Sequence, residues 1–217
     1  MTLNREGFED LLKQSPRELS GLTVVNEDLA KLDLSDVIFK NCDFSGSDLS
    51  RASLEEARFS GCKAYSAKFK YANADESEFT NCNLALTDWE GAHLSAVSFK
   101  GCKLTGANFL NTHNLGMNFE ECVLVGANLK KLSFHKTAVL RNDFSDADLG
   151  GVDFSEAVFE DCNLRGASLR HAKFQGADLR GCDLGSLSLT DAAVLKGATV
   201  SKVQATELLR ALGILVR

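Results

Sequence analysis

Proline is nearly absent from this chain of 217 residues: the one proline, Pro16, lies close to the N-terminus. No stretch approaches the roughly 20 consecutive apolar residues that a membrane-spanning helix needs, so we expect no membrane contact. Residues 1–13 contain acidic side chains and no long apolar run, which is unlike a signal peptide. A cytoplasmic location is the resulting expectation.

Chemical motifs are also missing. The sequence has no glycine-rich phosphate loop and no nucleophile–base pair, so it does not indicate an enzyme. Zinc ligands usually lie two to four residues apart, and no cysteine or histidine pair has that spacing. The net charge of −6 is mildly acidic, and no basic face of the kind that binds nucleic acid is evident. We therefore expect no metal, no cofactor and no direct contact with nucleic acid.

Cysteine, by contrast, is present on a regular grid. All seven cysteines fall on one 20-residue period, and the one empty place on that grid holds Asn142. They are Cys42, Cys62, Cys82, Cys102, Cys122, Cys162 and Cys182. A second column lies three residues ahead and consists of Phe39, Phe59, Phe79, Phe99, Phe119 and Phe159. Columns with a fixed period indicate a solenoid, in which each coil repeats the side chains of the coil beneath it.

The 20-residue period divides into four units of five residues. From Leu29 to Leu189 every fifth residue is a large apolar centre, Leu or Phe, except Ala64, Ala74, Trp89, Asn114 and Val139. The residue two before each centre is usually small and the one between is usually polar, as in Ala147-Asp148-Leu149. Alternate residues of an extended segment point the same way, so the small and large residues face inward. Glycine often follows the centre, where the chain must turn a corner. Four such sides predict a square coil.

This pattern, A(D/N)LXX in consensus, resembles that of the pentapeptide-repeat proteins over residues 24–200. The resemblance implies an all-β solenoid, a right-handed quadrilateral β-helix. Its unbroken register leaves no place for a linker or a second domain. The cysteines are then buried small side chains, because parallel stacked thiols suit neither disulfide nor tetrahedral metal geometry. Asn142 is expected either to weaken the core locally or to bind a neighbouring carbonyl.

The ends of the solenoid must be covered, because an open coil exposes backbone groups and apolar core. Residues 1–23 are expected to form an N-terminal capping helix and its lead-in. Residues 201–217 are expected to form a C-terminal helix that serves as cap and dimerisation element. Between Leu189 and Val200 the five-residue register slips by one.

The C-terminal segment carries a narrower resemblance, to the Qnr-type quinolone-resistance proteins. It lies in Gln204-Ala205, Leu208-Leu209 and Leu212-Gly213-Ile214. In that subfamily the element makes a coaxial homodimer, which implies an interface formed by Leu208, Leu209, Leu212 and Ile214. The resemblance also implies protection of DNA gyrase and topoisomerase IV by a rod that imitates duplex DNA. Two departures stand against it: no loop interrupts the register, and the N-terminal helix is an addition.

Two groups of acidic residues are candidates for such imitation. One is an outward column along the rod, broken by Lys68, that contains Asp28, Asp48, Asp88 and Asp148. The other is a band within one coil, without a basic residue, that contains Asp143, Asp146, Asp148, Asp153, Glu156, Glu160 and Asp161. A mixed-charge surface that keeps the protein soluble explains both equally well.

Two functions follow as hypotheses. The first is a non-enzymatic, DNA-mimicking binder of type II topoisomerase that protects gyrase from quinolones or modulates it. The alternative is a scaffold or adaptor with another protein partner. That partner would bind an apolar patch from Leu110 to Met117. The patch surrounds Asn114, whose side-chain amide stands at an inward-facing centre.

Overall fold

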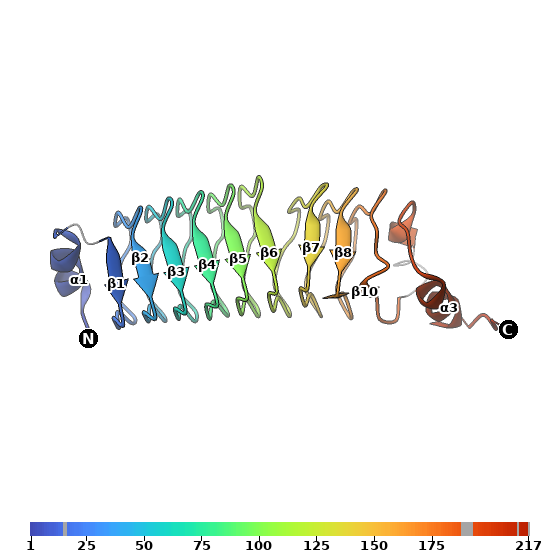
Figure 1. Ribbon diagram of the computed structural model, residues 1–217, viewed down its shortest axis with the longest axis horizontal. Coiled ribbons are helices and arrows are strands. Elements are labelled where there is room, and N and C mark those ends of the chain that lie inside the picture. The colour runs from blue at the N-terminus through green and yellow to red at the C-terminus, as the bar shows by residue number, and fades with distance from the viewer. Residues whose placement is uncertain (15–16, 188–192, 212, 217) are drawn as a thin grey trace.

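The computed structural model describes residues 1–14, 17–187, 193–211 and 213–216. It is a rod of stacked parallel coils with a helix at each end (Figure 1). Eight strands follow one another along one side as a parallel sheet in chain order. The strands are β1 (Glu18–Ser20), β2 (Ile38–Lys40), β3 (Arg58–Ser60), β4 (Glu78–Thr80), β5 (Ser98–Lys100), β6 (Asn118–Glu120), β7 (Ala138–Leu140) and β8 (Val158–Glu160), with β9 (Cys162–Asn163) and β10 (Cys182–Asp183) pairing separately.

Three further ladders of single backbone bridges complete the coil. We call the side that carries β1–β8 side 1, and the sides that carry Asp43, Asp48 and Ser53 sides 2, 3 and 4. Each of these residues bridges in parallel to the residue 20 positions later, as Asp43 does to Lys63. The predicted fold, a quadrilateral β-helix, is thereby confirmed in its 20-residue parallel coils and its four sides.

The interior is filled by the two columns seen in the sequence. The rings of Phe39 and Phe59 stack with their centroids 4.8 Å apart, and Phe59 continues onto Phe79 at 4.7 Å. All seven cysteines are buried and free. The thiol of Cys62 donates to the carbonyl oxygen of Phe39 at 3.4 Å, and others in the column do the same one coil further on. The cysteines are therefore packing residues with a weak hydrogen bond, as expected.

The corners explain why the pattern prefers Asp or Asn before each centre. A carboxylate oxygen of Asp48 accepts the backbone N–H of Ser50 at 2.9 Å, and Asp153 accepts that of Ser155 at 3.0 Å. The next residue turns the chain with a positive φ, for example Arg51 at 59°. Asp and Asn side chains stabilise such turns by accepting an N–H two residues on, so these acids have a structural role.

Helix α1 (Arg5–Leu12) covers the first coil. Phe8 is fully buried, and its ring lies 6.5 Å from that of Phe39 and 6.0 Å from that of Phe44. Before the helix, the backbone N–H of Leu3 donates to the carbonyl of Thr23 at 2.8 Å. The N-terminal segment thus supplies both apolar cover and backbone partners to the open end.

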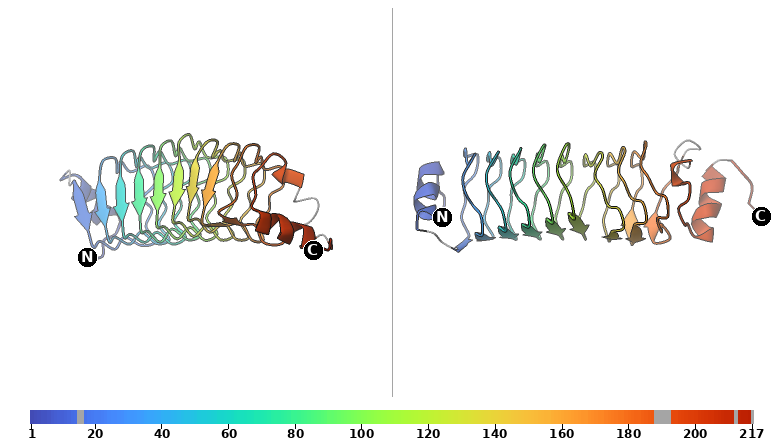
Figure 2. Two further views of the ribbon diagram at one scale, coloured as in Figure 1. Left: turned by 45° about the vertical axis from the view of Figure 1, so that its right-hand side comes forward. Right: turned by 90° about the horizontal axis from the view of Figure 1, so that it is seen from above.

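The far end closes through a shifted register. Asp178 bridges Thr199, which lies 21 rather than 20 positions later, so the predicted slip of one residue is present. Leu189, the last centre of the predicted register, lies outside the described residues. A short 3-10 turn, η1 (Ala193–Leu195), leads into helix α3 (Lys202–Ala211), which lies across the end of the rod (Figure 2).

Gln204 in α3 fixes that helix to the last coil. Its side chain is almost fully buried, and its Nε2 donates to the carbonyl oxygens of Leu179 and Cys182, both at 2.7 Å. These carbonyls have no further coil to pair with, so the glutamine amide takes the place of one. In the described parts of the chain, no helix has the length and apolar character that crossing a membrane requires.

Candidate functional site

The predicted acidic column lies on side 3, but its acids are paired. The carboxylates of Asp28, Asp48, Asp88 and Asp148 lie 3.3, 3.7, 3.0 and 2.7 Å from the basic groups of Arg5, Lys68, Lys70 and Lys130. Desolvation acts to raise the pKa of Asp48, but the hydrogen bonds from Ser50 and the charge of Lys68 outweigh it and lower the pKa. Because each acid has a cation beside it, the charge of the column is partly compensated, although Arg5 and Lys70 also pair with Glu9 and Glu90.

The predicted acidic band encircles the rod. Its members occupy all four sides and the corners between them, since Asp143 bridges along side 2, Asp148 along side 3 and Asp153 along side 4, while Glu160 lies in β8 on side 1. Four of its members pair with cations: Asp148 with Lys130 at 2.7 Å, Asp153 with Lys173 at 3.7 Å, Glu156 with Lys136 at 3.6 Å and Glu160 with Arg141 at 3.6 Å. The structure therefore does not bring the band together on one face.

An acidic edge that the sequence analysis missed lies at the corner between sides 4 and 1. We define the acidic edge as Asp36, Glu55, Glu56, Asp75 and Glu76, from three consecutive coils. All five are exposed or half-buried, and within the described parts of the chain none forms an ion pair. Arg17 and Arg58 flank the edge across a hollow of about 530 Å³. A search of the two corner positions of each coil would have found these acids in the sequence.

Basic side chains gather on the neighbouring corner, between sides 3 and 4. Lys130, Lys131, Arg170 and His171 line a hollow of about 430 Å³ there, over Gly150 and Gly151. This basic corner was not among the predicted sites. One edge of side 4 thus carries acids in the coils of residues 36–76, and the other edge carries bases in the coils of residues 130–171.

The stack of coils is interrupted between β6 and β7, where the ribbons lie visibly further apart (Figure 1). The patch predicted from Leu110 to Met117 lies beside this interruption. Leu115 is 86% exposed, Met117 is buried and Leu110 is half-buried, so the patch reduces mainly to Leu115. The Asn114 side chain donates through Nδ2 to the carbonyl of Ser133 at 3.1 Å.

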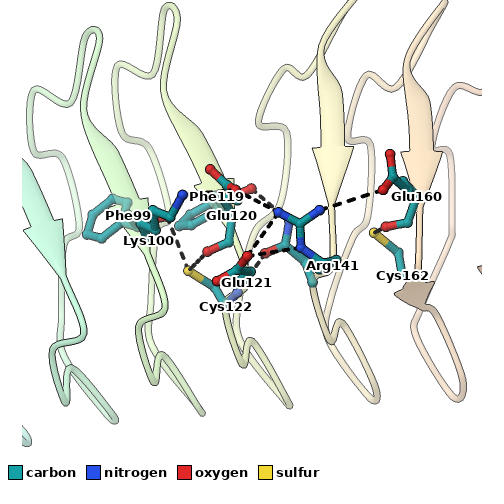
Figure 3. Close-up of polar contacts among 10 residues, drawn as sticks. Phe99, Lys100, Phe119, Glu120, Glu121, Cys122, Arg141, Glu160 and Cys162 are labelled. Atoms are coloured by element: carbon teal, nitrogen blue, oxygen red, sulfur yellow. Dashed lines mark hydrogen bonds and ion pairs between the residues drawn. The ribbon is translucent and has the colours of Figure 1, made fainter.

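A cluster of charges bridges the same interruption on side 1 (Figure 3). The guanidinium of Arg141 lies 2.7 Å from a carboxylate oxygen of Glu120 and 2.9 Å from one of Glu121, in the coil before the interruption. It also reaches Glu160 at 3.6 Å in the coil after its own, and Lys100 pairs with Glu120 at 3.1 Å. These ion pairs join the two halves of the rod where the backbone ladder is weakest.

The predicted dimer residues divide between two environments. Leu208 is half-buried and packs against the core of the last coil. Leu209 and Ile214 are 39% and 48% exposed, and the neighbouring Leu215 is 85% exposed. Leu212 lies outside the described residues. Part of the segment therefore caps the rod, and the rest leaves an apolar surface at its tip.

Histidines 93 and 113 stack on side 4 with ring centroids 4.7 Å apart. Over the described ranges, no three His, Cys, Asp or Glu side chains come together as a metal site would require. The aligned, outward-facing histidines are neighbours because the 20-residue coil stacks equivalent positions, and their contact requires no ligand.

Comparisons with known proteins bear on both the repeat and the rod. The family model described as "Pentapeptide repeat region" matches residues 32–109, and the one described as "Pentapeptide repeats (8 copies)" matches residues 143–185. Together they match more than half of the chain. No curated protein matches the chain in sequence.

Among solved structures, a trypsin-treated form of QnrB1, described as a plasmid-mediated fluoroquinolone resistance protein, is similar with a TM-score of 0.82. It is 23% identical, and the match covers 92% of this chain and 99% of that one. Full-length QnrB1 has a TM-score of 0.71 at 22% identity, over 91% of this chain and all of that one. At such identity the likeness shows the fold, while the repeat itself is matched by two family models. This chain belongs to the pentapeptide-repeat family.

Proposed function

We propose that the protein is a non-enzymatic binder of type II topoisomerase, DNA gyrase in particular, that presents its rod in place of duplex DNA. The similarity to QnrB1 supports this proposal, because nearly the whole of both chains takes part in it and that protein is described as conferring fluoroquinolone resistance. A homodimer through the C-terminal tip and a cytoplasmic location belong to the same proposal.

The observation that carries the proposal is the unpaired acidic edge. Three stacked coils span roughly 14 Å at about 4.8 Å a coil. The five carboxylates of the acidic edge lie within that length: Asp36, Glu55, Glu56, Asp75 and Glu76. This density is within a factor of about two of the one charge per 1.7 Å of duplex DNA. A basic DNA-binding surface would meet the edge through electrostatic complementarity. The ion-paired column on side 3 contributes less, because its field is already partly compensated.

A supercoiling assay with purified gyrase tests the proposal. We expect micromolar protein either to relieve quinolone inhibition or to inhibit supercoiling, and binding to weaken as salt screens the charges. Glu55, Glu56 and Glu76 accept no corner hydrogen bond within the described residues, so changing all three to Lys should leave the fold intact. This triple variant should bind gyrase at least tenfold more weakly.

A matched control carries the same change in charge at positions away from the acidic edge and the predicted band: Glu6→Lys, Asp10→Lys and Glu207→Lys. It should keep binding within about twofold of the unaltered protein. If the unaltered protein has no effect on gyrase with or without quinolone, the topoisomerase proposal is wrong.

The alternative function, an adaptor for another protein, is favoured by one observation. Leu115 lies beside an interruption of the coils and is 86% exposed, the highest exposure among the large apolar side chains of the described residues. Loss of partner binding on Leu115→Asp, without any effect of the protein on gyrase, would favour the adaptor.

A further inference from the structure

The backbone ladder of side 4 is broken at one place. Neighbouring coils are bridged there from Asp33 to His113 and again from Ser133 to Lys173, but in the described structure His113 and Ser133 do not bridge. On side 1, β6 and β7 pair only through Glu120 and Leu140, whereas every other pair of neighbouring strands in that sheet pairs through three residues. The break therefore opens side 4 and the adjoining part of side 1.

The break leaves backbone donors free. One coil earlier, the N–H groups of Leu94 and Ala96 donate to the next coil at 2.8 Å each. Their equivalents, Asn114 and Gly116, have no such acceptor within the described parts of the chain. Across the break, the N–H groups of Ser133 and Ala138 likewise lack the carbonyls that their equivalents one coil earlier, His113 and Asn118, bind at 3.0 and 2.9 Å.

Two strand-like edges thus face one another across a hollow. Its volume is about 500 Å³, and it is lined by Leu115, Met117, Ser133, His135 and Thr137, among others. Unpaired strand edges offer alternating donors and acceptors, which a further extended chain can satisfy. We call this hollow the inter-coil slot.

The charge around the inter-coil slot is positive or neutral. None of its lining residues is acidic. His135 lies in the wall and Lys136 follows it at the corner. The carboxylates of Glu156 and Asp153 in the next coil are already paired, with Lys136 at 3.6 Å and with Lys173 at 3.7 Å. A partner that supplies carboxylates is therefore complementary to this site, and Leu115 offers it an exposed apolar contact.

Contacts on sides 1 and 2 hold together the two coils that border the inter-coil slot. Asn142 accepts the N–H of Cys122 at 2.9 Å and donates to the carbonyl of Phe119 at 2.8 Å, and Arg141 binds Glu120 (Figure 3). These bonds keep the two coils together on sides 1 and 2, while on side 4 the backbone ladder is replaced by the side-chain bond from Asn114 Nδ2 to the carbonyl of Ser133 at 3.1 Å. The opening is a local feature of the fold and does not divide the rod.

We propose that the inter-coil slot binds an extended acidic–apolar peptide segment of a protein partner. The segment would accept hydrogen bonds from the free N–H groups of Asn114, Gly116 and Ser133, place an apolar side chain on Leu115 and direct carboxylates toward His135 and Lys136. Free N–H groups on two facing edges beside the exposed apolar side chain of Leu115 favour an extended peptide over a phosphate or a lipid head group. This inference does not depend on the proposed action on gyrase.

Amide hydrogen exchange and peptide titration, both followed by NMR on the full chain, test the proposal. In the free protein, the amides of Asn114, Gly116, Ser133 and Ala138 should exchange at least about 100-fold faster than their equivalents one coil earlier. The probe is the acetylated and amidated peptide Asp-Ala-Asp-Leu-Glu-Val-Asp, and its control carries Lys at every acidic position. The acidic peptide should bind saturably and slow exchange at these four amides, and the Lys peptide should bind at least tenfold more weakly.

Variants make the test specific. Leu115→Asp should reduce binding of the acidic peptide at least tenfold, while Leu86→Asp, which changes a 49% exposed leucine at another corner, should not. Native-like spectra of both variants exclude misfolding as the cause. Slow exchange at the four amides in the free protein would overturn the proposal, as would binding of neither peptide at millimolar concentration or equal binding of both.

Discussion

The side-chain amide of Asn142 donates a 2.8 Å hydrogen bond to the carbonyl oxygen of Phe119, at the place where a cysteine thiol meets the equivalent carbonyl in other coils. The thiol of Cys122 reaches the carbonyl of Phe99 at 3.3 Å in the same way. The amide adds a bond that sulfur makes only weakly, because its Oδ1 accepts the N–H of Cys122 at 2.9 Å. Asn142, which interrupts the cysteine column, therefore links its coil to the preceding coil more strongly than a cysteine would, beside the broken ladder.

Loss of this amide should destabilise the protein. Asn142→Ala leaves a buried donor and a buried acceptor unpaired, which costs about 1–3 kcal/mol. Asn142→Cys restores the weaker thiol contact and should stay within about 1 kcal/mol of the unaltered protein. Urea unfolding measures both differences. Equal stability of the Ala variant would show that these hydrogen bonds add nothing.

The seven thiols should be inert in the folded protein. Burial raises the pKa of Cys162 and of Cys182, and every thiol of the column is buried, so little thiolate forms at neutral pH. Ellman's reagent at pH 8 should label none of them within an hour, and all of them once guanidinium unfolds the chain. Stoichiometric labelling of the folded protein would contradict the packing described above.

Acid should destabilise the coils through their corner carboxylates. The hydrogen bond from Ser155 lowers the pKa of Asp153, and that from Arg180 lowers the pKa of Asp178. Because the folded pKa lies below the unfolded value of about 3.9, the unfolded chain binds more protons as the pH falls. The stabilisation is thus complete above about pH 5 and is lost toward pH 2.

Thermal unfolding between pH 7 and pH 2 measures this loss. Ser155→Ala should lower the melting temperature at pH 7 and reduce its fall toward pH 2, because one of the bonds that favour the carboxylate of Asp153 is gone. A melting temperature that stays constant from pH 5 to pH 2 would show that the corner carboxylates are not linked to folding.

The C-terminal tip should associate two rods. Leu209, Ile214 and Leu215 are exposed on one short segment, and burying such a surface against a second copy is favourable at roughly 25 cal/mol per Å². Light scattering should give a dimer at tens of micromolar, and Leu209→Glu or Ile214→Glu should give a monomer. Leu86→Glu, at a distant corner, is the control that should stay dimeric. A monomeric unaltered protein rejects the interface.

The repeat made the fold readable from the sequence. Each coil stacks on its equivalent, so residues in contact lie a constant 20 positions apart, and a column such as Cys42, Cys62 and Cys82 is visible without coordinates. The capping role of Phe8 and the register slip before Thr199 were readable for the same reason, since a solenoid must be closed where its period ends. In this fold, the period of the sequence therefore predicts which residues are in contact.

The pairing of surface charges and the place of the broken ladder became known only from the tertiary structure. A long charged side chain can reach partners on several coils. The 20-residue period therefore does not predict that Asp88 pairs with Lys70, or that Glu56 has no such partner in the described chain. The break between His113 and Ser133 was only partly predictable, because Asn114, Val139 and Asn142 depart from their columns in the coils on either side but do not tell which ladder opens. Pairing of charges and opening of a ladder depend on the combined geometry of neighbouring coils, which no single column of the sequence contains.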